Sequence, residues 1–298
     1  MEIVGIAERS ERVPLKLSVQ TDSYESLEQA VDSTCSSIRF GSEFCEYKMP
    51  DLETLQKVRD LVHSRRKELT YVTPRLSNKG LELVKRSLGL LNEGEKLNVV
   101  VNDLGTLNII EQYQNLKPHL GRQLTRIPAR SPWMDTYTLE DGFLARRWYA
   151  KVFSSTSLNY LLTVDLFRTK GVRNADVDWI PRTFPSFEQL TKYGISLHIH
   201  LHLVPVTLTR RCHTARFLGK KTPEKCSFPC LDKTFHLRNE LFNLELYLCG
   251  NAVFSLEQPD RKMIRELEKI GVNEYVLTMN PITGIRNSQD IDDFSQSL

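Results

Sequence analysis

Short apolar runs alternate along the chain with longer segments in which apolar residues recur every three or four positions. The runs at residues 37–40, 69–72 and 97–101 are typical of buried strands and follow one another about every 30 residues, the size of a βαβ unit. Between them, residues 52–62 and 81–91 each carry an apolar stripe with helical spacing. The pattern predicts parallel strands joined by crossover helices.

Repeated right-handed crossovers lead to an open sheet or a closed barrel, and we favour an α/β fold related to the (β/α) TIM barrel. Further strands are expected at residues 120–127, 195–208, 244–248 and 275–279, and further helices at residues 158–169 and 261–270. With 298 residues, 40% of them hydrophobic, the chain can form one barrel-like domain over residues 1–298. The polar composition of residues 280–298 predicts a mobile C-terminal tail.

The charge of the chain changes this picture little. Its 40 basic and 37 acidic residues give a net charge of +3, too balanced to indicate a nucleic-acid or membrane partner. No apolar run approaches the roughly 20 residues that cross a bilayer, so no membrane span is expected. Charged residues interrupt the first 19 positions, so no signal peptide is predicted and we expect a cytoplasmic protein. Six cysteines in a reducing compartment favour metal binding or catalysis over disulfides.

Three of these cysteines, Cys212, Cys226 and Cys230, lie close together in the chain, with several arginines and lysines nearby. Several thiolates that converge from one segment suit an iron–sulfur cluster or a zinc ion, and basic side chains offset their negative charge. Residues 209–240 are therefore predicted to form a cysteine-rich, metal-binding appendage after a late strand. The spacing does not choose between the two metals.

A fourth donor must come from elsewhere, and the candidates are Cys35, Cys45, Cys249 and His213. Cys45 follows the strand that ends at residue 40, and Cys212 follows the strand that ends near residue 208. Both are therefore expected at the C-terminal rim of the barrel, where barrel proteins build their sites. Cys35 precedes its strand and is expected at the opposite rim, as a bystander. Cys249 also ends a predicted strand, so it competes with Cys45.

Several short motifs resemble the collagenase-like peptidase family U32. They are FGSEFC at residues 40–45, NDLG at 102–105 and above all RCHTAR at 211–216, followed by Cys226 and Cys230. The resemblance is to the short members that act in anaerobic ubiquinone hydroxylation. It implies an oxygen-independent hydroxylase subunit that acts on an aromatic ring, such as a quinone precursor, as a heteromer with a homologous family member. It also implies a 4Fe-4S cluster, with zinc as the alternative, held by Cys45, Cys212, Cys226 and Cys230.

Two other functions remain open at this point. Related family members hydroxylate tRNA or ribosomal RNA, and the basic stretch at residues 210–225 supports an RNA substrate. Alternatively, zinc or a cluster staples the appendage in a protein without enzymatic activity. Peptidase activity is disfavoured, because the chain has no His-Glu-x-x-His or Gly-x-Ser-x-Gly motif and its one Cys/His pair, Cys212 and His213, consists of adjacent residues.

Two polar features near predicted strand ends are candidates for chemistry. His198, His200 and His202 alternate, so they share one face of a strand. They are expected to bind a second metal, to line the outer face or to satisfy a polar network in the core, and His202 is the one expected nearest the substrate or cluster. Asp103 ends the strand at 97–101, where it orients a ligand or acts as a base, or else caps the next helix.

Overall fold

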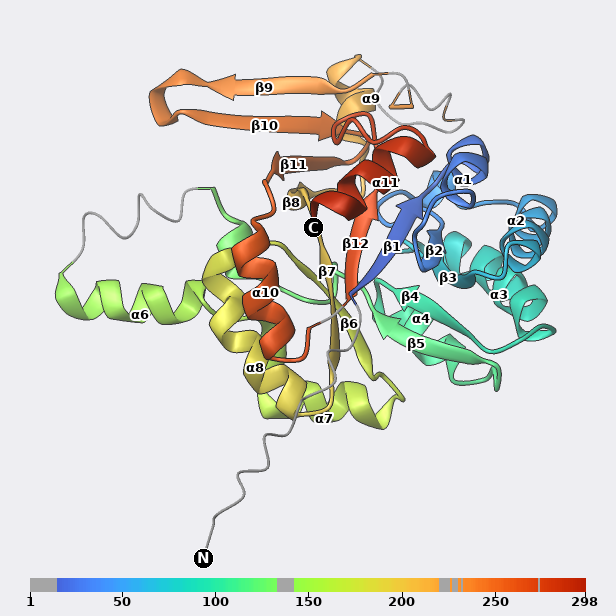
Figure 1. Ribbon diagram of the computed structural model, residues 1–298, viewed down its shortest axis with the longest axis horizontal. Helices are drawn as coiled ribbons and strands as arrows, with labels where there is room; N and C mark the ends of the chain where they lie inside the picture. The colour runs from blue at the N-terminus through green and yellow to red at the C-terminus, as the bar shows by residue number, and fades with distance from the viewer. Residues whose placement is uncertain (1–14, 133–141, 220–225, 227–229, 232, 273) are drawn as a thin grey trace, which may run out of the picture.

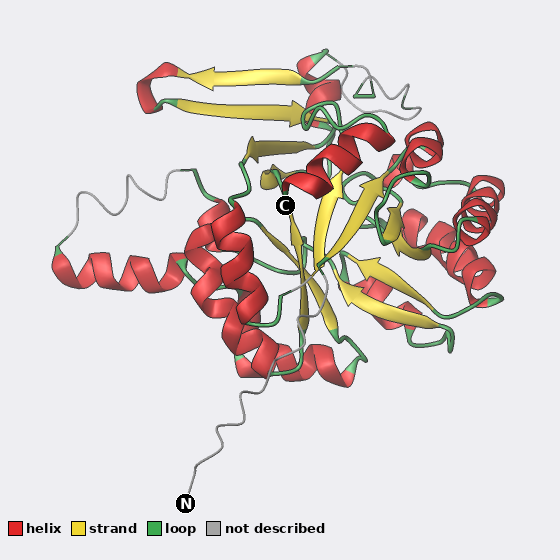
Figure 2. Cartoon of the chain, in the orientation of Figure 1, coloured by secondary structure: helices red, strands yellow, loops and turns green. Residues whose placement is uncertain are grey.

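The core of the protein is a closed barrel of eight parallel strands (Figures 1 and 2). The computed structural model describes residues 15–132, 142–219, 226, 230–231, 233–272 and 274–298. Around the barrel the strand order is β1-β12-β7-β6-β5-β4-β3-β2, so the TIM-barrel prediction is confirmed. The strands are β1 (Lys16–Thr21), β2 (Ser37–Phe40), β3 (Glu68–Val72), β4 (Leu97–Val101), β5 (Leu116–Leu120), β6 (Asn174–Asp178), β7 (Ser196–His200) and β12 (Glu274–Thr278).

Helices surround the barrel and bury the apolar stripes seen in the sequence. The side chain of Asp51 accepts a hydrogen bond from the Thr54 amide at 2.7 Å, which begins α2, and the buried face of that helix includes Leu55, Val58 and Val62. The helices that follow barrel strands, or cover the barrel from outside, are α1 (Tyr24–Ala30), α2 (Leu52–Ser64), α3 (Asn78–Asn92), α4 (Leu104–Ile110), α6 (Phe143–Phe153), α7 (Leu161–Thr169), α8 (Phe184–Lys192) and α10 (Arg261–Lys269).

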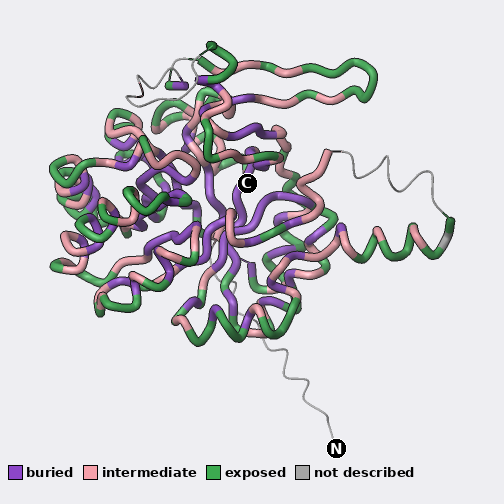
Figure 3. Tube along the Cα trace, turned by 180° about the vertical axis from the view of Figure 1, so that it is seen from behind, coloured by how far each residue is buried: buried purple, intermediate pink, exposed green. Residues whose placement is uncertain are grey.

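A second, antiparallel sheet is inserted between β7 and β12. Its order is β8-β11-β10-β9, with β8 (Leu203–Leu208), β9 (Phe235–Asn239), β10 (Leu244–Cys249) and β11 (Ala252–Leu256). The sheet lies beyond the C-terminal ends of β1 and β12, and its β9–β10 hairpin projects from the body and is largely exposed (Figures 1 and 3). The predicted appendage at 209–240 is thus one part of a larger accessory sheet, which also contains the strand predicted at 244–248.

The strand predicted at residues 195–208 is wrong in its extent, because it is two strands in two different sheets. His202 has a left-handed backbone (φ 65°) and lies between β7 and β8. The Leu203 amide bonds to the Leu201 carbonyl at 2.8 Å, and the Glu257 amide bonds to the His202 carbonyl at 2.7 Å. This bend takes the chain from the barrel into the accessory sheet.

The strand predicted at 120–127 is also wrong, and β1 and β6 are strands that the apolar pattern did not predict. β5 ends at Leu120, where the predicted strand begins. The reason is a polar barrel interior: His119 of β5 and Asp176 and Asp178 of β6 are at most 1% exposed. Strands that bury acids and histidines do not show the apolar runs expected of a parallel sheet.

Residues 280–298 contain a helix where composition predicted a mobile tail. Helix α11 (Ser288–Ser297) begins with a capping box between Asn287 and Asp290, and Ile291 is fully buried. Asp292 accepts hydrogen bonds at 2.7 Å from the amide and hydroxyl of Thr34, which ties the helix to the chain beside α1. In the part of the chain that the structure describes, no helix is both long and apolar enough to cross a membrane.

Candidate functional site

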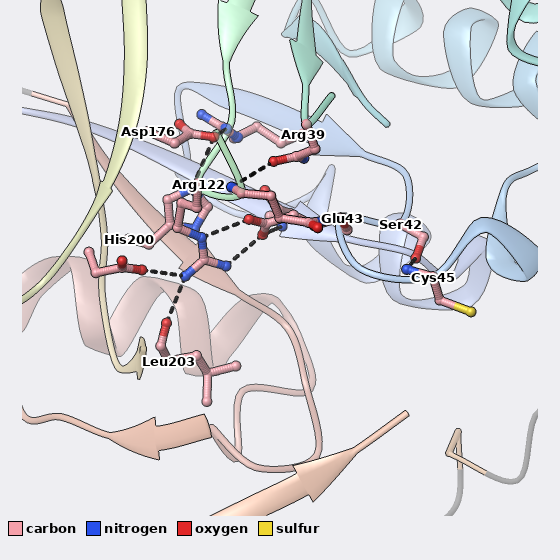
Figure 4. Close-up of polar contacts among 12 residues, drawn as sticks. Arg39, Ser42, Glu43, Cys45, Arg122, Asp176, His200 and Leu203 are labelled. Atoms are coloured by element: carbon pink, nitrogen blue, oxygen red, sulfur yellow. Dashed lines mark hydrogen bonds and ion pairs between the residues drawn. The ribbon is translucent and has the colours of Figure 1, made fainter. Parts of the chain in front are cut away.

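Cys45 lies on a loop that leaves the C-terminal end of β2. Gly41 begins this loop with φ +130°, and a Cβ atom there would lie 2.2 Å from the Val72 carbonyl oxygen, so only glycine fits. Farther along, the Ser42 hydroxyl accepts a hydrogen bond from the Cys45 amide at 3.2 Å. These local contacts hold the cysteine at the mouth of the barrel, beside the polar side chains of its interior (Figure 4).

Cys212, Cys230 and Cys249, from the segment between β8 and β11, lie near Cys45. Cys212 caps the short helix α9 (His213–Phe217), with its sulfur 3.4 Å from the Ala215 amide. Cys249 ends β10, and its thiol donates to the carbonyl of the buried Cys230 at 3.7 Å. Cys226 is half-buried, and most of its neighbours in the chain lie outside the described residues.

The thiols of four cysteines are close enough to act on one another electrostatically. Burial, opposed by Lys48 and assisted by Cys249, Cys45 and Cys212, raises the pKa of the Cys230 thiol to about 12. Burial also raises the pKa of Cys45 to about 11, with a smaller contribution from Cys212. The structure therefore gathers Cys45, Cys212, Cys230 and Cys249, which includes both competitors for the fourth position.

A partly buried lysine adjoins these thiols. Lys48 lies in the turn η1 (Glu46–Lys48), and its amine bonds to the Asp22 carboxylate at 2.8 Å. Burial would lower the pKa of Lys48, but Asp22, Cys230 and Cys249 raise it above its ordinary value. The ammonium ion is a fixed positive charge beside the thiols, suited to offset thiolate charge.

A cavity of about 70 Å³ separates the cysteines from the barrel interior. On one side it is lined by Cys45, Cys230 and Cys249, and on the other by Glu43 and Arg122. The remaining lining is mixed, with apolar side chains from both sheets: Phe44, Leu203, Phe254 and Met279. The cavity therefore joins a thiol-rich wall to a charged wall, both enclosed between barrel and accessory sheet.

The charged wall is a buried ion-pair network centred on Arg122 (Figure 4). Its guanidinium donates to both oxygens of Glu43, at 2.8 and 2.5 Å, to Asp178 at 3.0 Å and to the Leu203 carbonyl at 2.7 Å. Gln20 donates to Glu43 at 3.1 Å, and Arg130 pairs with Asp178. Because Leu203 begins β8, Arg122 connects the barrel to the accessory sheet. Sequence reasoning missed this network, since only Glu43 lay in a recognised motif.

A second buried polar cluster lies deeper in the barrel. Asp176 accepts from His119 at 2.8 Å and from Arg39, and these partners hold the pKa of Asp176 well below its ordinary value although burial alone raises it. His198 and His200 face this cluster, with His200 Nε2 3.3 Å from Asp176. Of the alternatives considered for the alternating histidines, an outward orientation is thus wrong for these two.

The remaining candidates lie apart from the cysteines. His202 bonds through Nδ1 to the Glu257 carbonyl at 3.1 Å, and its ring contacts Phe294 of α11. Asp103 caps α4, where it accepts from the amide and hydroxyl of Thr106 at 2.8 and 2.9 Å. Cys35 precedes β2 and is buried, with its sulfur 3.6 Å from the Ala30 carbonyl oxygen. These three side chains all have structural partners where they stand.

Comparison with known proteins yields similarity of fold alone. No family model and no curated protein matches this chain. The U32 peptidase Mk0906 aligns over 92% of this chain and 95% of its own, with 12% identity and a TM-score of 0.43. Dihydropteroate synthase from Thermus thermophilus covers 96% and 95% (12% identity, TM-score 0.40), and orotidine 5'-monophosphate decarboxylase from Sulfolobus solfataricus covers 95% and 99% (10%, 0.40).

Proposed function

We propose that this chain is an iron–sulfur protein of the U32 peptidase type and a subunit of an oxygen-independent hydroxylase. The observation that carries the proposal is the approach of cysteines from three segments at the mouth of the barrel: Cys45, Cys230 and Cys249 line one cavity, and Cys45 and Cys212 line another. Thiols gathered in this way from distant segments are the usual ligands of a metal centre. The proposed 4Fe-4S ligands are Cys45, Cys212, Cys226 and Cys230.

The choice of a cluster over one zinc ion rests on the resemblance to the U32 family. In a tetrahedral zinc site with bonds of about 2.3 Å, the sulfur atoms lie about 3.8 Å apart. A four-iron cluster has its ligands on separate iron atoms and therefore spreads them more widely. Iron, sulfide and zinc assays decide between the two.

The state of the thiols argues against a cysteine peptidase. A nucleophilic cysteine needs a lowered pKa, usually from a neighbouring histidine or a helix N-terminus. Here burial raises the pKa of Cys45 to about 11 and that of Cys230 to about 12, so both thiols are protonated at neutral pH. A metal centre, which displaces the protons on binding, is the chemistry that such thiols serve.

Aromatic and charged side chains line the cavity together. Phe44 and Phe254 stack edge to face with ring centroids 5.3 Å apart, and the Arg122 guanidinium lies 5.3 Å from the Phe44 ring. We therefore propose an aromatic ring of the ubiquinone-precursor kind, as the resemblance to the UbiV type of protein implies. The cluster would supply electrons, while Arg122 and Glu43 orient the polar substituent. A UbiU-like homologue is the proposed partner.

Anaerobic purification tests this function directly. We expect a brown protein that bleaches in air, contains about four irons and four sulfides per chain, and carries a lipid-soluble quinone precursor when co-expressed with the partner. Iron, sulfide and zinc assays, with mass spectrometry of bound molecules, provide the measurement. Stoichiometric zinc without iron would contradict the proposal, and bound RNA in place of the quinone precursor would favour an RNA-modifying enzyme.

A further inference from the structure

We infer that His119, Asp176 and His198 form a second metal site, for one divalent first-row transition-metal ion, inside the barrel and separate from the cysteines. Their ligand atoms all lie within 4.8 Å of one another, and the three residues are 1%, 0% and 7% exposed. Two histidines and one carboxylate are a ligand set that suits iron(II), zinc(II) or cobalt(II). The site does not depend on the iron–sulfur proposal.

The spacing of the atoms fits a shared ion. Two atoms bound at about 2.1 Å to one metal lie about 3.0 Å apart at an octahedral angle and about 3.4 Å apart at a tetrahedral one. His119 Nε2 is 2.8 Å from Asp176 Oδ1, and His200 Nε2 is 3.3 Å from Asp176 Oδ2. His200 thus lies beside the carboxylate of the site, although it is not one of the three residues whose ligand atoms gather within 4.8 Å.

His198 has the kind of hydrogen-bond partner that usually supports a metal-ligating histidine. A ligating histidine usually bonds through its other ring nitrogen to a carboxylate, which fixes the ring. His198 Nδ1 lies 2.9 Å from Glu274 Oε1, and the Ser18 hydroxyl donates to that same oxygen at 2.8 Å. This arrangement leaves Nε2 of His198 for an ion.

His200 supplies an independent observation. Its side chain is fully buried, and neither ring nitrogen makes a hydrogen bond. Its Nε2 lies 3.3 Å from Asp176 Oδ2 without hydrogen-bond geometry, so Asp176 satisfies this buried imidazole only in part, and coordination of a metal by one nitrogen would satisfy it better.

Charge is compatible with a bound cation. Arg39 pairs with Asp176 and lies 3.4 Å from His198 Nδ1, so one guanidinium and two carboxylates, those of Asp176 and Glu274, share the enclosed space. With neutral imidazoles the cluster has a formal charge of −1, which a divalent ion changes to +1.

Cobalt(II) is the probe that distinguishes this site from the thiols. Full-length protein produced in cobalt-supplemented medium, or refolded with cobalt(II), should retain one cobalt with nitrogen and oxygen ligands in addition to any thiolate-bound cobalt. Visible and X-ray absorption spectra separate the two, because only the thiol site shows sulfur-to-cobalt charge transfer. His119→Gln and Asp176→Asn should each lose the nitrogen/oxygen-ligated cobalt and keep the sulfur-ligated signal.

Two further variants guard against a folding defect. Glu274→Gln keeps a hydrogen-bond acceptor beside His198 and should weaken cobalt binding by about 10–100-fold without loss of the ion pair at Asp176. His202→Gln, outside the barrel, should bind as the wild type does. If folded wild-type protein retains no cobalt with nitrogen and oxygen ligands, or if His119→Gln and Asp176→Asn retain it fully, the cluster is an ion-pair network and the inference is wrong.

Discussion

The side-chain amide of Asn251, in the turn between β10 and β11, donates a hydrogen bond to the backbone carbonyl of Phe44, the residue before Cys45. The same amide donates to the Thr209 carbonyl at 3.0 Å, just after β8. Asn251 thus connects the loop that carries Cys45 to the segment that leads to Cys212. The two ends of the proposed cluster site are held in place by one side chain.

Asn251→Ala should therefore reduce cluster content more than its effect on folding explains. Loss of two hydrogen bonds to backbone carbonyls costs about 2 kcal/mol of unfolding free energy. We expect iron per chain to fall by at least half in anaerobic preparations, measured beside the thermal unfolding midpoint. Asn115→Ala is the matched control, since Asn115 donates to the Asn92 and Gly94 carbonyls at 2.9 and 3.3 Å, near the N-terminal end of β4. Equal iron loss in both variants would contradict a specific role of Asn251 in holding the cluster site.

The fourth ligand can be identified by iron content. Cys45→Ala should lose the cluster as completely as Cys226→Ala or Cys230→Ala, while Cys35→Ala should keep it, because Cys35 is buried before β2. Cys249 adjoins Cys230, so Cys249→Ala is the informative comparison. If Cys249→Ala loses iron and Cys45→Ala keeps it, the assignment of Cys45 fails and the other three ligands stand.

Removal of Arg122 alone, with its acidic partners kept, should strongly lower the free energy of unfolding. Arg122→Met leaves Glu43 and Asp178 buried without their shared cation, and we expect a loss of about 3–5 kcal/mol in unfolding free energy. The double variant Arg122→Met with Glu43→Gln should recover part of that loss, because one of the unpaired charges is gone. Urea denaturation of the wild type, of each single variant and of the double variant measures this coupling, and simple additivity would show that Glu43 and Arg122 act independently.

Replacement by alanine should lower the stability of the protein at Gly41 and raise it at Gly89. At Gly41 the added Cβ meets a backbone oxygen at 2.2 Å and the positive φ is strained, so Gly41→Ala should destabilise the fold by more than about 2 kcal/mol and displace the Cys45 loop. At Gly89, inside α3, nothing lies within 4 Å, and alanine should stabilise by about 0.5–1 kcal/mol. Thermal unfolding tests both variants. If Gly41→Ala is as stable as the wild type, the strained turn at Gly41 does not require glycine.

The periodicity of the sequence determined three consecutive strands of the barrel and the helices between them. The strands β2, β3 and β4 and the helices α2 and α3 were predictable because their apolar residues face either the barrel or its helices with regular spacing. The cysteines after residue 210 led to the prediction of a metal centre, because residue type alone marks a possible thiolate ligand, and this stays a prediction. These features depend on local pattern and need no knowledge of distant neighbours.

Only the tertiary structure decided the rest. Whether His119, Asp176 and Asp178 belong to strands depends on partners such as Arg39 and Arg122, which lie far away in sequence and neutralise them inside the barrel. The accessory sheet likewise depends on the left-handed backbone at His202, which no apolar pattern indicates. Periodicity shows which residues of a segment are buried and which are exposed. A buried charge is instead stabilised by its contacts, and those contacts exist only once the chain has folded.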